Sequence, residues 1–140
     1  MKKYVLSVSL AILLTGCATQ NAGKDMSADD QLELNAPLYC EGEKQCKDAW
    51  ERAMYYVTTN SGYKIQTAND MLIQTYNPTA TDTKLAWQIT KKPLGNSKYQ
   101  IMTSAWCNNV FGCYPDAYEA ILAAKRYIKI AIPEVEYKSL

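Results

Sequence analysis

The chain has 140 residues, with 15 basic and 14 acidic side chains, five cysteines, 11 tyrosines and no histidine. This length suits one domain, and the balanced charge excludes the strong basic field with which proteins bind nucleic acid. The lack of histidine excludes serine–histidine and cysteine–histidine nucleophile systems, histidine metal sites and the usual general base near pH 7. The sequence therefore argues against a nucleic-acid-binding protein and against these enzyme classes.

The first residues have the pattern of a secretory signal. A basic start at 1–3 precedes an apolar run over 5–14, and small residues follow it. The run is shorter than the roughly 20 residues of a membrane-spanning helix, so it predicts a signal peptide over 1–16. The end of this signal resembles the lipobox of bacterial lipoproteins through its residues Leu14-Thr15-Gly16-Cys17.

The resemblance implies a lipid anchor on Cys17. In that family the matching cysteine receives a diacylglyceryl group, the signal is cut before it, and the new amino group is acylated. Several acyl chains anchor a protein stably, because each buried methylene contributes about 0.8 kcal/mol. The family often retains in the inner membrane those members with Asp after the cysteine. Here Ala18 follows, which favours the periplasmic side of the outer membrane, with surface exposure left open. The alternative is an ordinary secretory signal that happens to end in a cysteine.

The remaining chain divides into a tether, a domain and a tail. Without residues 1–16 it would have 124 residues, with 13 basic against 14 acidic side chains, because two lysines lie in the signal. The lipidated cysteine and a polar, small-residue stretch form a predicted flexible tether over 17–37. A single domain is expected over 38–132, followed by a polar tail over 133–140.

The domain shows a helix, four strands and a second helix. Apolar residues at three- and four-residue spacings predict a helix over 43–60, with the core stripe Cys46, Trp50, Ala53, Met54 and Val57. Alternating patterns predict two hairpins, with strands at 63–67, 71–76, 85–90 and 99–106 and a turn at 93–97. A helix over 115–130 follows, with Pro115 in its first turn. This order predicts an α+β fold in which two helices cover a four-stranded antiparallel meander sheet, a two-layer domain stapled by disulfides.

The four cysteines of the domain form two pairs with the same spacing. An oxidising compartment favours disulfides over zinc, and each pair brackets a short turn, so we favour the local pairing Cys40–Cys46 and Cys107–Cys113. Bridges between the two loops are the first alternative, and a zinc site of four cysteines is the second. No C-x-x-C redox motif is present.

The catalytic residues of an enzyme are not evident, and we expect no cofactor and no metal. Acidic residues gather near the first helix, where a glycosidase would need two carboxylates across a sugar; they are Glu41, Glu43, Asp48 and Glu51. Their positions are better explained by the helix dipole and a solvated helix face.

Aromatic residues are the stronger signal, because they exceed what two small helices must bury. Val110, Phe111 and Tyr114 lie in or beside the second cysteine loop, where they would form a rigid anchor for a partner. The alternative is that Val110 and Phe111 close the end of the core. We therefore expect a non-enzymatic lipoprotein that binds another envelope component, most simply a protein. An inhibitor or immunity protein against a periplasmic hydrolase and a peptidoglycan-binding module are the alternatives.

Overall fold

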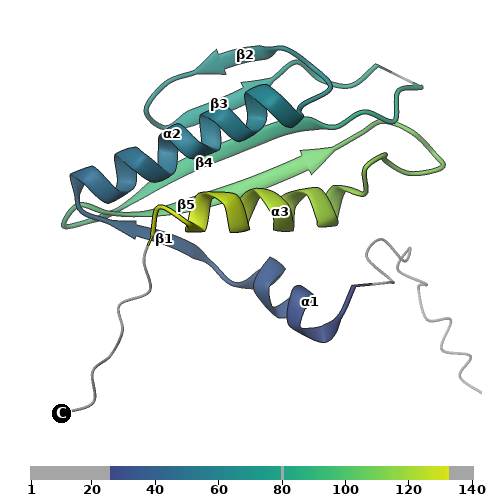
Figure 1. Cartoon of the computed structure of the whole chain (residues 1–140). Helices are drawn as coiled ribbons and strands as arrows, with labels where there is room; N and C mark the ends of the chain where they lie inside the picture. Colours follow the sequence, from purple (N-terminus) through teal and green to yellow (C-terminus); the bar gives the residue numbers. More distant parts are fainter. Residues whose placement is uncertain (1–25, 80, 133–140) are drawn as a thin grey trace, which may run out of the picture.

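The computed structural model describes residues 26–79 and 81–132, and the predicted signal peptide, Cys17 and the tail at 133–140 lie outside these residues. Within them the chain folds as α+β (Figure 1). The elements in chain order are α1 (Ala28–Asn35), β1 (Leu38–Glu41), α2 (Glu43–Asn60), β2 (Ile65–Ala68), β3 (Leu72–Thr75), β4 (Ala86–Gly95), β5 (Lys98–Trp106) and α3 (Ala117–Lys129). The helix predicted over 43–60 has the predicted bounds. The second predicted helix starts two residues late, because Asp116 caps it by accepting hydrogen bonds from the backbone of Tyr118 and Glu119.

The sheet has five antiparallel strands in the order β1-β5-β4-β3-β2. Strands β2 to β5 form the predicted meander, and β1 adds a fifth strand beside β5. Leu38 pairs with Ile101 and Cys40 with Tyr99. The sequence did not predict β1, because a segment of four residues is too short for its alternation to be recognised as a strand. It becomes a strand because β5 offers its free edge.

The hairpin between β4 and β5 is longer than predicted. β4 continues through Pro93 to Gly95, so most of the predicted turn at 93–97 belongs to the strand. The turn itself is Asn96 and Ser97, both with positive φ. Two-residue turns of this kind match the twist of the flanking strands, so the two strands stay paired to the end.

The core lies between one face of the sheet and two helices. Figure 1 shows α2 and α3 side by side on the same face of the sheet. Nearly all of the stripe predicted for α2 is buried, and the sheet contributes Ile73, Trp87, Ile89 and Ile101. The opposite face carries the polar row Gln74, Gln88 and Ser104 across three strands. In the described part of the chain no element covers that face, which is usual for antiparallel sheets.

Helix α1 lies inside the stretch that we expected to be a flexible tether. None of its residues is buried, so the sequence has no apolar stripe there that would predict a helix. Ser27 caps its first turn through a hydrogen bond from the Asp30 backbone. At its other end the ammonium of Lys125 on α3 donates to three carbonyls, those of Glu33, Leu34 and Ala36. The last carbonyls of a helix lack partners within it, so Lys125 of α3 supplies hydrogen-bond donors that the residues near α1 do not supply.

The two disulfides have the favoured local pairing. Cys40 and Cys46 join β1 to α2, and Cys107 and Cys113 close the loop that follows β5. Because each sulfur is bonded to its neighbour, the bridges between loops and the four-cysteine zinc site are both wrong. Cys40 pairs with the start of β5 and Cys107 follows its last residue. The two bridges therefore sit at opposite ends of one strand.

Candidate interaction site

The loop over 107–113 is held in one shape by its own contacts. The disulfide joins its ends, and within it the Asn109 carboxamide oxygen accepts a hydrogen bond from the Phe111 backbone at 2.9 Å. Gly112 has a φ of +104° and donates its backbone N–H to the Asn109 carbonyl at 3.2 Å. A side chain would strain the backbone at that φ. We call residues 107–114 the stapled loop.

A neighbouring polar loop braces the stapled loop from outside. The Asn109 carboxamide donates to the Thr81 carbonyl at 3.0 Å, and the Tyr114 backbone N–H donates to the Thr83 carbonyl at 2.9 Å. The sequence showed only a polar stretch at 79–83, so this support was not predicted. The brace and the disulfide reduce the entropy that the loop would lose on binding.

The apolar residues of the stapled loop project into solvent. The side chains of Val110, Phe111 and Tyr114 are 94%, 96% and 83% exposed. Val110 and Phe111 therefore do not close the end of the core, and that alternative interpretation is wrong. Exposed apolar residues that are scattered singly need no explanation, but three on one rigid projection make a candidate contact site. The structure keeps all three predicted interface residues together.

The acidic residues near α2 point to no comparable site. Asp48 forms an ion pair with Lys44 at 2.6 Å, which raises the pKa of that lysine, and Glu51 lies 3.9 Å from Lys47. Both pairs are four residues apart on the exposed side of the helix, where such pairs contribute a few tenths of a kcal/mol. Their geometry is that of a solvated helix face.

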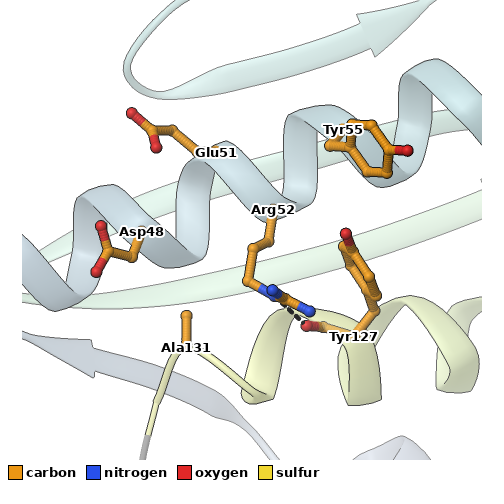
Figure 2. Close-up of a pocket in the computed structure, with 6 residues that line it drawn as sticks. All are labelled: Asp48, Glu51, Arg52, Tyr55, Tyr127 and Ala131. Atoms are coloured by element: carbon orange, nitrogen blue, oxygen red, sulfur yellow. Dashed lines mark hydrogen bonds between the residues drawn. The ribbon is translucent and has the colours of Figure 1, made fainter.

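A hollow of about 430 Å³ lies between α2 and α3, beside a contact between Arg52 and the Tyr127 ring (Figure 2). The Arg52 guanidinium lies 4.0 Å from the centre of the Tyr127 ring and donates to the Tyr127 carbonyl at 2.7 Å. The Tyr55 ring stacks on Tyr127 at 6.2 Å. Figure 2 shows Asp48 and Glu51 directed away from the guanidinium. Arg52 is thus occupied in joining the two helices.

Within residues 26–79 and 81–132, no three cysteine or acidic side chains gather as metal ligands would. None of the helices described there is long and apolar enough to cross a membrane. Comparisons with protein-family models, curated proteins and solved structures gave no match to this chain. The stapled loop and the N-terminal sequence are therefore the features of this chain that bear on function.

Proposed function

We propose that this protein is a non-enzymatic lipoprotein of the bacterial outer membrane, anchored through Cys17, that binds a protein of the cell envelope through its stapled loop. The observation that carries the proposal is the near-complete exposure of Val110, Phe111 and Tyr114 on a loop fixed at both ends. Aromatic residues of this kind supply large contact area at low entropy cost and dominate many interfaces. A rigid projection also suits an inhibitor or immunity protein that enters the cleft of a periplasmic hydrolase, which is the second candidate.

The loop is tested with Phe111→Ala and a photo-crosslinking amino acid at position 110 in the bacterial host. We expect one envelope protein to crosslink at position 110 and to be lost in Phe111→Ala. Because Phe111 is exposed, its truncation should change the free energy of unfolding by no more than about 0.5 kcal/mol.

Ile130→Ala is the matched control, since Ile130 is also an exposed apolar residue, at 70%. It should keep the crosslink. Equal capture by both variants, or a collapse of stability in Phe111→Ala, contradicts the proposal. A captured hydrolase that loses activity on binding would select the inhibitor. Retention on sacculi without a protein would select the peptidoglycan-binding module.

The anchor is tested with Cys17→Ala followed by membrane fractionation. The wild-type chain should sediment with outer membranes, and the variant should remain in the soluble fraction, because acyl chains on Cys17 supply the membrane affinity. Ala18→Asp should move the anchored protein to inner membranes if the sorting preference of the lipoprotein family applies. Membrane retention of Cys17→Ala would refute the lipid anchor.

A further inference from the structure

A cavity of about 640 Å³ opens between the first turns of α2, the turn from β2 to β3 and the strands β4 and β5. Its volume lies in the range of roughly 300–1,000 Å³ typical of small-molecule sites. It sits at the end of the sheet that carries the Cys40–Cys46 disulfide, whereas the stapled loop follows the other end of β5. The cavity is therefore separate from the proposed interaction site.

One part of the wall of this cavity is aromatic and apolar, and it is held in place. Tyr99 and Trp50, which is 7% exposed, supply two aromatic rings, and Met71 and Cys46 line the space beside them. The Trp50 indole N–H donates to the Asn69 carbonyl at 3.0 Å, which fixes the ring. Such walls receive an apolar group without prior rearrangement.

One wall carries a cation in an unusual place. Lys91 lies on the core side of the central strand β4, two residues after buried Ile89 and opposite buried Ile101. Its ammonium lies 5.0 Å from the centre of the Trp50 ring and 5.4 Å from that of Tyr99. Among the described residues it makes no ion pair and no side-chain hydrogen bond. An ammonium has three donors, so Lys91 keeps them available for a ligand.

The cavity also carries carboxylates without partners. Of its three acidic residues, Glu51 lies near Lys47, but Glu43 and Asp70 form no ion pair with any described residue. The unpaired charges are thus one cation against the aromatic wall and two carboxylates. A simple organic anion would be repelled by those carboxylates, whereas a ligand with both a carboxylate and an ammonium complements them.

We propose that this cavity binds the carboxy-terminal end of a short peptide. The terminal carboxylate accepts hydrogen bonds from Lys91, the last side chain is apolar and packs on Trp50 and Tyr99, and the free amino group lies toward Glu43 and Asp70. Charge-assisted hydrogen bonds of this kind are about twice as strong as neutral ones. The competing explanation is that Lys91 only covers the Trp50 ring with its aliphatic stem.

The test is calorimetric titration of the full-length chain in detergent with glycyl-glycyl-leucine and with its carboxy-terminal amide. Lys91→Met keeps an aliphatic side chain over Trp50 and removes the ammonium. Lys92→Met is the matched control, because it removes the same charge from an exposed position on the opposite face of the strand. We expect the wild type and Lys92→Met to bind the free acid equally, and Lys91→Met to bind it about tenfold more weakly. The wild type should bind the amide as weakly as Lys91→Met binds the acid.

Three results would overturn the proposal: no binding by the wild type at millimolar peptide, equal binding by Lys91→Met, or equal binding of acid and amide. The NMR signal of the Trp50 indole N–H, assigned with Trp50→Phe, should shift on titration, and a constant signal with measurable binding would place the peptide elsewhere. Should Lys91→Met fail to fold, the comparison of acid and amide on the wild type decides alone.

Discussion

The two disulfides close loops of equal length at opposite ends of β5 but lie in different surroundings. Each joins cysteines six positions apart. Cys40 and Cys46 are 1% and 2% exposed and belong to the core, whereas Cys107 and Cys113 lie partly buried at its margin beneath an exposed tip. Loop-closure entropy is the same for both. The same cysteine spacing therefore gives two different bridges. The Cys40–Cys46 bridge is part of the core, and the Cys107–Cys113 bridge supports an exposed loop.

The largest expected effect comes from removing the inner bridge. Cys40→Ala combined with Cys46→Ala should lower the free energy of unfolding by about 3–4 kcal/mol, of which roughly 2.4 kcal/mol is loop entropy and the rest lost burial. Urea unfolding of the oxidised protein measures this loss. A cost no larger than that of the outer bridge would contradict the difference in burial.

Removing the outer bridge should cost less stability. Cys107→Ala combined with Cys113→Ala should lower the free energy of unfolding by about 2.4 kcal/mol, the loop entropy alone, since little buried sulfur is lost. The hydrogen bonds of Asn109, Gly112 and Tyr114 would then hold the tip without the disulfide. We expect the crosslink from position 110 to weaken while the domain stays folded by circular dichroism. An undiminished crosslink would show that the bridge does not prepare the tip for binding.

The smallest expected effect is the release of α1 from α3 in acid. Helix α1 precedes β1, the strand that carries Cys40 of the inner bridge. The hydrogen bond from Arg126 holds the pKa of Asp30 below its ordinary value. A lowered pKa stabilises docking at pH values above the ordinary value of about 4, and this contribution is lost as the pH falls below it. The protection factors of the α1 amides, which are corrected for the slower intrinsic exchange in acid, should therefore fall on acidification, while Cys40 in β1 stays protected because the bridge holds it.

Arg126→Met is the control for this release. It removes the ion pairs with Asp30 and Glu33 but leaves the hydrogen bonds from Lys125, so α1 should exchange faster than in the wild type at neutral pH and respond little to acid. Loss of protection in β1 together with α1 would show that the inner bridge does not isolate the strand. A wild-type α1 that keeps its protection in acid would show that the Asp30 pair contributes nothing to docking.

Prediction from sequence succeeded where the signal was local. The apolar spacing of α2 needs only contacts three and four residues apart, and the alternation of β2 to β5 needs only the next strand along the chain. The local disulfides likewise follow from short separations. Prediction failed at α1 and β1, whose partners are Lys125, Arg126 and β5, all more than 50 positions away.

The interaction site, too, was predicted in part from the sequence and in part seen only in the structure. The sequence placed Val110, Phe111 and Tyr114 in or beside a closed loop, but the same residues would suit the end of a core. The exposure of all three side chains and the brace from Thr81 and Thr83 are seen only in the tertiary structure. Lys91 gave no signal, because it follows the strand predicted over 85–90, and a lysine at such a strand end looks the same whether its side chain faces solvent or a cavity.

The sequence by itself determined the order of α2, the meander strands and α3, and it favoured the local disulfides and predicts a lipid anchor. Each depends on periodicity or on residues close together in the chain. The tertiary structure decided that polar residues 28–35 form a helix, that Phe111 is exposed, and that Lys91 lines an aromatic cavity. These outcomes arise from contacts between distant segments, whose burial and charge no local pattern records.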